Sequence, residues 1–218
     1  MFESRLLPKE IGLALDLTSW LNDALGTNEA LTAEIVRKFS DEYFQIPFYE
    51  RELSRHIAVA HSGAGNPFLK AIAENFWMPI NTLITYASPF LNAPSSFASN
   101  PNFKTLINVW GSADEHADQF KSLGIPFGKQ NFSSAGIQTL NIEILGAHHT
   151  DFWYADDKWT NKNDPINQEI NRRTALFMAK LTKAAESQDE LNRFLVKPGI
   201  TKTPDGTYQV NLDGFFPA

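Results

Sequence analysis

The stretch HIAVAHSGAG, residues 56–65, decides the fold of this chain. Its short apolar run ends in very small residues, which predicts a buried strand over 55–61 followed by a sharp turn. Asn66 and Pro67 come next. A proline suits the first turn of a helix, because the amide proton that it lacks would have no helical partner there. The stretch therefore predicts a strand, a tight turn and a helix in immediate succession.

Three further apolar stretches, over 80–87, 104–110 and 138–145, predict more buried strands, and a long helix is expected from about 165 to 184. Strands that alternate with helical segments favour the α/β class, with a mostly parallel sheet and helices on both of its faces. Near the end of the sequence, a turn pattern at 203–206 predicts a hairpin of two short strands.

The composition limits the classes of function. The 218 residues are 43% hydrophobic, which is enough for one domain with a substantial core. A net charge of −6 without a basic stripe argues against nucleic-acid binding. The lack of cysteine excludes disulfides and thiolate nucleophiles. No signal peptide and no transmembrane segment are expected, and the compartment stays open.

Polar side chains follow three of the predicted strands, at the ends where parallel sheets gather functional groups. The first strand ends at Ser62, in the pattern A-x-S-x-A. A serine between a strand and a helix is typical of a nucleophile when its neighbours are small, because the turn is strained and leaves no room for larger side chains. The alternative interpretation is a helix N-cap serine after a glycine-rich turn.

Asp114 follows the third strand, and His148 and His149 follow the fourth. Alone, the aspartate could be a turn or capping residue, and either histidine could be structural. Together the three residue types occur in the order serine, acid, histidine after strands of one predicted sheet. This arrangement predicts that Ser62, Asp114 and His149 meet as a hydrolytic triad.

At these motifs the sequence resembles the α/β-hydrolase superfamily, and in particular its lipase- and esterase-like members. The likeness covers roughly residues 55–184. It rests on VAHSGAG at 59–65, LITYASP at 83–89, NVWGSAD at 108–114 and LGAHHTDF at 145–152. A looser likeness is to the hydrolase-like ends of bacterial polymorphic toxins.

The resemblance implies a serine hydrolase that cleaves an acyl ester or a lipid through an acyl-enzyme, without a cofactor or a metal. Ser62 matches the nucleophile, and His149 matches the general base, with His148 as the runner-up. Asp114 matches the acid that orients the imidazole, and the backbone N–H of Gly63 matches one oxyanion donor.

Aromatic residues near the predicted site suggest how a substrate would be held. Phe90, Phe152 and Trp153 are expected to line an apolar mouth and to bind the substrate. His61, which directly precedes the predicted nucleophile, is interpreted as a packing or supporting residue and not as a base.

One hydrolase-like domain is expected over 1–197, with a helical N-terminal part at 1–54 and a catalytic core at 55–184. A C-terminal hairpin tail is expected to follow it at 198–218. The family normally has several strands before the nucleophile, and the first 54 residues show none. The first strand would then lie at the edge of the sheet, where apolar strands invite pairing. Either helices from 1–54 cover that edge, or a second polypeptide completes the sheet and supplies a second oxyanion donor.

Three alternatives from other classes remain open. An inactive hydrolase-like domain that binds a partner would have much the same sequence. A metal-dependent hydrolase could take ligands from His148, His149, Asp151 and the acidic and histidine residues of 114–118. The residues 62–65 could also form the phosphate loop of a nucleotide-binding module, although the third glycine of that motif is missing.

Overall fold

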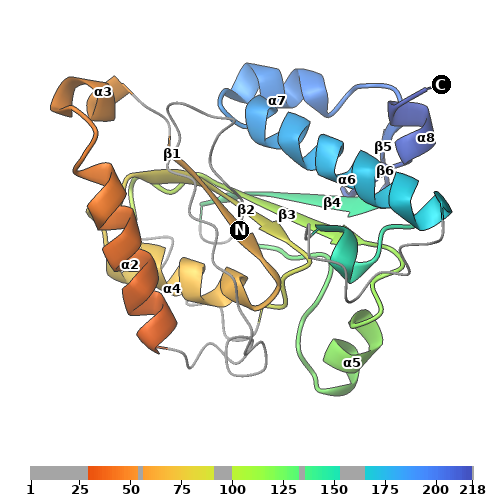
Figure 1. Ribbon diagram of the computed structural model, residues 1–218, viewed down its shortest axis with the longest axis horizontal. Helices are drawn as coiled ribbons and strands as arrows, with labels where there is room; N and C mark the ends of the chain where they lie inside the picture. The colour runs from red at the N-terminus through yellow and green to blue at the C-terminus, as the bar shows by residue number, and fades with distance from the viewer. Residues whose placement is uncertain (1–28, 54–55, 91–99, 133–135, 153–164, 218) are drawn as a thin grey trace.

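The computed structural model describes residues 29–53, 56–90, 100–132, 136–152 and 165–217, and a six-stranded sheet forms its centre (Figure 1). The strand order is β1-β2-β3-β4-β6-β5. The first four strands are β1 (His56–His61), β2 (Ile80–Tyr86), β3 (Thr105–Gly111) and β4 (Gln138–Ile144). Each is parallel to the next. The prediction of four neighbouring parallel strands is confirmed.

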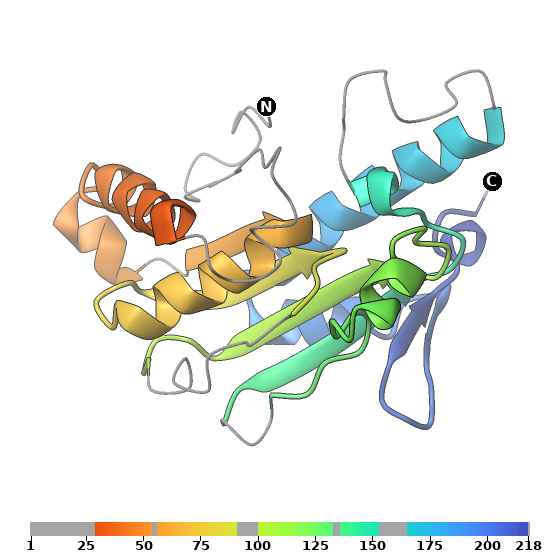
Figure 2. The same cartoon turned by 90° about the horizontal axis from the view of Figure 1, so that it is seen from below.

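Helices cover both faces of the sheet, as predicted, and each face has its own hydrophobic core (Figures 1 and 2). On one face α2 (Glu29–Tyr43) and α4 (Gly65–Glu74) pack against the sheet; on the other, α6 (Pro165–Ala184) and α7 (Gln188–Phe194) do so. This cover explains why β3 is buried at every residue, since a strand with both faces covered does not alternate between buried and exposed positions.

Short elements complete the described chain. The helices α3 (Phe48–Leu53), α5 (Ala117–Ser122) and α8 (Leu212–Phe215) lack the length that would make a periodic pattern recognisable in the sequence. Ser187 caps the start of α7, because its hydroxyl accepts the backbone N–H of Glu190 at 3.1 Å. None of the described helices is both long and apolar enough to cross a bilayer.

The predicted C-terminal hairpin consists of β5 (Ile200–Lys202) and β6 (Tyr208–Val210), which are antiparallel. It does not stand apart as a tail. β6 lies parallel to β4, and the backbone N–H of Leu145 donates to the carbonyl of Val210 at 2.9 Å. The hairpin therefore extends the sheet beyond the strand that precedes His149.

A row of polar side chains crosses the interior of the sheet. Thr85, Asn108 and Asn141 occupy neighbouring positions in register on β2, β3 and β4, and all three are buried. Asn108 donates to the Asn141 side chain at 3.2 Å and to the Gly128 carbonyl at 2.7 Å, and Asn141 exchanges two 2.8 Å hydrogen bonds with the backbone of Gln130. These bonds fix the segment around residues 128–130 to the sheet.

The strand order places β1 at one edge of the sheet, and no described strand pairs with its outer side. Two helices that precede it, α2 and α3, belong to the region predicted to be helical. At the first residue of β1, Phe39 and Tyr43 of α2 contact the His56 ring edge-on, with ring centroids 6.4 and 5.3 Å away. Residues 1–28 of the N-terminal part expected to be helical lie outside the described residues, and a second polypeptide stays a prediction.

Candidate functional site

Ser62 lies in the tight turn between β1 and α4. It begins a single 3₁₀ turn, Ser62–Ala64, and has a φ of +51°, a left-handed conformation that costs a residue with a side chain roughly 1–3 kcal/mol. The flanking Ala60 and Ala64 are buried, which leaves no room for larger side chains on either side of the turn. The small residues of the sequence pattern are thus explained by packing.

The loop after β2 packs closely against this turn. A Cβ atom on Gly65 would lie 2.8 Å from the Cβ of Ser88, so only glycine permits this approach. Ala87 also has a left-handed φ, of +48°, and it follows Tyr86, which pairs in register with His61. The residues that directly follow the neighbouring strands β1 and β2, Ser62 and Ala87, therefore both have a left-handed φ although neither is glycine. The sequence did not indicate this feature.

The loops that carry Asp114 and His149 form one packed unit. The Ala113 N–H donates to the Ala147 carbonyl at 3.1 Å, and the Gly146 N–H donates to the Ser112 hydroxyl at 2.9 Å. A Cβ on Gly111 would lie 2.6 Å from the Ala147 carbonyl carbon and closer still to its oxygen. The absence of a side chain at this glycine lets the two loops touch.

His149 joins the other two residues through both of its ring nitrogens. Its Nδ1 lies 2.9 Å from Asp114 Oδ2, and its Nε2 lies 3.0 Å from Ser62 Oγ. A carboxylate only accepts hydrogen bonds, so the Nδ1 proton is donated to Asp114 and Nε2 of the neutral ring accepts the Ser62 hydroxyl. The structure thus brings together the three residues that the sequence singled out.

Burial and further hydrogen bonds hold this chain of contacts in place. The Asp114 side chain is fully buried, and its second oxygen accepts the backbone N–H of His116 at 2.9 Å. The His149 side chain is 10% exposed. Both groups are therefore shielded from water on most sides, which strengthens electrostatic interactions between them.

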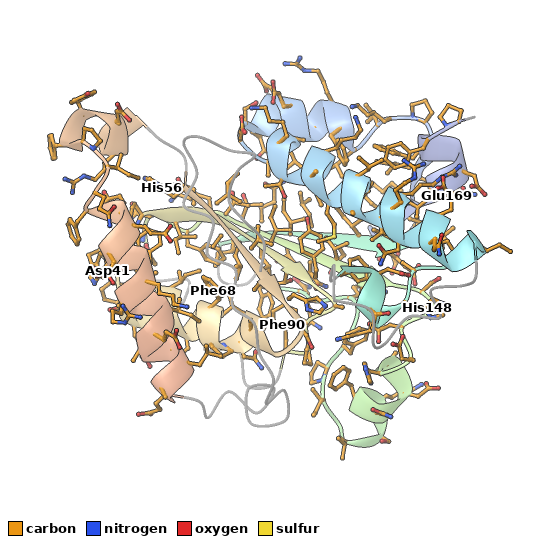
Figure 3. The ribbon with its side chains drawn as sticks, viewed as in Figure 1. Asp41, His56, Phe68, Phe90, His148 and Glu169 are labelled. Atoms are coloured by element: carbon orange, nitrogen blue, oxygen red, sulfur yellow. The ribbon has the colours of Figure 1, made fainter. Side chains whose placement is uncertain are left out.

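His148 occupies a different position from His149. Its side chain is 47% exposed, and its Nδ1 lies 3.7 Å from Glu115 Oε2. Figure 3 shows it close to the 3₁₀ turn His149–Phe152, on the side of α5. Of the two adjacent histidines, His149 is therefore the one whose ring contacts Ser62.

Two more histidine rings pack around His149. The His116 ring meets it edge-on at a centroid distance of 4.7 Å, and the His61 ring lies 5.2 Å away. Burial and, to a smaller extent, the proximity of His149 lower the pKa of His61 to about 3. His61 is therefore neutral near pH 7, as a supporting residue would be.

Two carboxylates secure the backbone of the histidine loop. Glu115 Oε2 accepts the backbone N–H of His149 at 3.1 Å. Burial opposes ionisation of Glu115, but hydrogen bonds from backbone N–H groups, including that of His149, lower its pKa overall. Asp151 Oδ2 accepts the backbone N–H of His148 at 2.7 Å, and burial raises the pKa of Asp151. The sequence had suggested these acids only as metal ligands.

The residues expected to contact a substrate have different environments. Gly63 is buried directly after Ser62, within the 3₁₀ turn. Phe90 and Phe152 are core side chains: Phe152 is 1% exposed and stacks on Tyr86, and Phe90 is 3% exposed. Figure 3 shows Phe90 near the site end of β1. This burial gives both phenylalanines a packing role, and their predicted contact with substrate stays untested. Trp153 lies outside the described residues.

The described residues contain no group of three or more histidine and acidic side chains arranged to hold a metal ion. Asp114, Glu115 and Asp151 accept the hydrogen bonds from His149, His116 and His148 described above.

No family model matches this chain, and neither the curated proteins nor the solved structures contain a significant match to it.

Proposed function

We propose that this protein is a serine hydrolase related to the α/β hydrolases, which cleaves an acyl ester or a lipid through an acyl-enzyme on Ser62. The observation that carries the proposal is the pair of hydrogen bonds that His149 makes, at 3.0 Å to Ser62 Oγ and at 2.9 Å to buried Asp114. Serine is a weak nucleophile, and an adjacent base held by a third group is the usual way to activate it.

The order of the residues along the sheet supports the relationship to α/β hydrolases. Ser62 follows β1, Asp114 follows β3 and His149 follows β4, all at the carboxyl ends of parallel strands. In α/β hydrolases the triad has this same chain order, and the nucleophile lies in a strained turn between a strand and a helix. The φ of +51° at Ser62 agrees with that turn.

The reaction would proceed in two halves. In the first, Ser62 Oγ attacks the ester carbonyl while His149 Nε2 takes its proton, and the imidazolium then gives this proton to the departing alcohol as the ester C–O bond breaks. In the second, His149 removes a proton from water, the hydroxide attacks the acyl carbonyl, and Ser62 recovers its proton as the acid leaves. Asp114 stabilises the imidazolium in both halves.

The negative charge that develops on the carbonyl oxygen needs hydrogen-bond donors. The backbone N–H of Gly63 would supply one of them, because Gly63 immediately follows the nucleophile at the start of a helical segment. A second donor would come from another part of the chain or from a partner.

Labelling with a fluorophosphonate tests the proposal, because this probe reacts only with an activated serine. The wild-type protein should be labelled, and Ser62→Ala and His149→Ala should not be. Ser122→Ala is a matched control, because Ser122 is an exposed serine on α5. In parallel, hydrolysis of p-nitrophenyl esters of increasing acyl length should fall by a factor of about 10⁶ in kcat without Ser62.

Labelling that persists in Ser62→Ala would refute the assignment of the nucleophile. A folded wild-type protein that neither reacts with the probe nor turns over any ester would favour the inactive binding domain instead.

A further inference from the structure

We propose that Glu115 is a positioning residue for His149, which it holds by the main chain and not by the ring. This inference rests on the proposed function, because it names a further residue on which the geometry of that site depends. Glu115 takes part in neither of the two hydrogen bonds that join the His149 ring to Asp114 and to Ser62. Its carboxylate instead accepts the backbone N–H of His149 at 3.1 Å.

The two peptide groups of His149 are held from opposite parts of the fold. Glu115, in the loop after β3, accepts its N–H. His61, the last residue of β1, places Nε2 3.4 Å from its carbonyl oxygen, and because a carbonyl oxygen only accepts, Nε2 is the donor in this contact. His149 therefore lies between the strand that leads into Ser62 and the loop that carries Asp114.

This arrangement leaves the His149 side chain few ways to move. The ring already bonds Asp114 and Ser62, and a rotation of the backbone would change both distances at once. Reacting groups that shift by about 1 Å can lose about 10²-fold in rate. The hydrogen bond from a backbone N–H to a carboxylate is among the stronger kinds. The side chain of Glu115 is 45% exposed, however, which weakens this bond by competition with water.

Three variants separate the hydrogen bond from the charge. Glu115→Ala removes both, Glu115→Gln keeps an oxygen that can accept the His149 N–H, and Asp118→Asn removes a charge from an exposed carboxylate three residues away that does not contact His149 in any hydrogen bond given by the structure. With a p-nitrophenyl ester, kcat should fall about tenfold in Glu115→Ala, which corresponds to about 1.4 kcal/mol of transition-state stabilisation. KM should be unchanged, because the bond positions a catalytic group and does not bind substrate. Glu115→Gln should recover most of the loss.

Amide hydrogen exchange gives a readout that does not need activity. The backbone N–H of His149 should exchange faster in Glu115→Ala than in the wild type, and the exchange in Glu115→Gln and Asp118→Asn should stay close to the wild-type rate. A wild type without esterase activity would refute the proposed function, while exchange would still decide whether Glu115 holds His149. Equal kcat in Glu115→Ala and wild type, or an unchanged exchange rate, would overturn the inference.

Discussion

The close approach of the acid loop to the histidine loop offers a sharp test of how this site is built. Gly111→Ala would place a Cβ 2.6 Å from the Ala147 carbonyl carbon. Carbon atoms in contact lie about 3.5–4.0 Å apart, so the two loops would have to separate by about 1 Å. Ala147 lies two residues before His149, and Gly111 lies three before Asp114. The separation would therefore be transmitted directly to the bond between Asp114 and His149.

The expected cost has two parts. Overpacking of this kind typically destabilises a protein by about 1–3 kcal/mol, which urea unfolding would measure. A displacement of about 1 Å between groups of an active site can lower kcat by about 10²-fold, which ester hydrolysis at a temperature well below Tm would measure. The loss of activity should thus exceed what partial unfolding can explain.

Gly124→Ala is the matched control. Gly124 has a φ of +68°, and a Cβ there would have no neighbour within 4 Å. Alanine at this position costs about 1–2 kcal/mol of backbone strain without pushing any loop. Its kcat should equal that of the wild type. If Gly111→Ala keeps full activity, or if Gly124→Ala loses as much, the reasoning about the two loops is wrong.

Three further predictions concern stability and pH. Asn108→Ala should lower the free energy of unfolding by about 1–3 kcal/mol in urea titrations, because it removes two buried hydrogen bonds, to the Asn141 side chain and to the Gly128 carbonyl; a loss below about 0.5 kcal/mol would contradict this. Phe152→Ala should cost about 3–5 kcal/mol in the same titrations, because the side chain is 1% exposed and stacks on Tyr86; a near-neutral result with altered KM would instead support the predicted substrate contact. Folding lowers the pKa of His61, so as pH falls the unfolded chain binds this proton before the folded protein does, and the contribution of His61 to stability is lost between pH 6.5 and about 3. In urea titrations at pH 7, 5 and 4, the free energy of unfolding should therefore fall more steeply with decreasing pH for the wild type than for His61→Gln.

Much of this structure was predictable because the decisive signals are local. The apolar run at 56–61 and the small residues after it indicate a buried strand and a tight turn on their own. The polar residues that follow β3 and β4 could be assigned to one site, because parallel strands bring their carboxyl ends together. The sequence could thus predict which three side chains would meet.

What the sequence could not predict depends on contacts between distant segments. The bond from Glu115 to the His149 backbone joins loops 34 residues apart and leaves no pattern in either loop. The left-handed φ at residue 87 could not be predicted, because the residue there is alanine and not glycine, which is the usual sign of such a conformation. The hairpin lies beside β4 because β6 pairs with β4, and a strand of only three residues does not indicate in its sequence which strand it will pair with. For Phe90 and Phe152, an apolar side chain next to a site looks the same in sequence whether it faces a substrate or the core.

The pairing of β6 with β4 also has a consequence for the order of events during synthesis. Ser62 and His149 lie 87 residues apart, and β4 gains its outer neighbour only when the residues up to Val210 are available. Chains grow at about 5–20 residues per second, so about 7–30 seconds separate the appearance of Ser62 from that of Val210, the last residue of the strand beside β4. Contacts this distant in sequence also form late in folding. A nascent chain would therefore hold Ser62 for seconds before His149 is fixed beside it, and under the proposed function the serine would become reactive only as the sheet is completed.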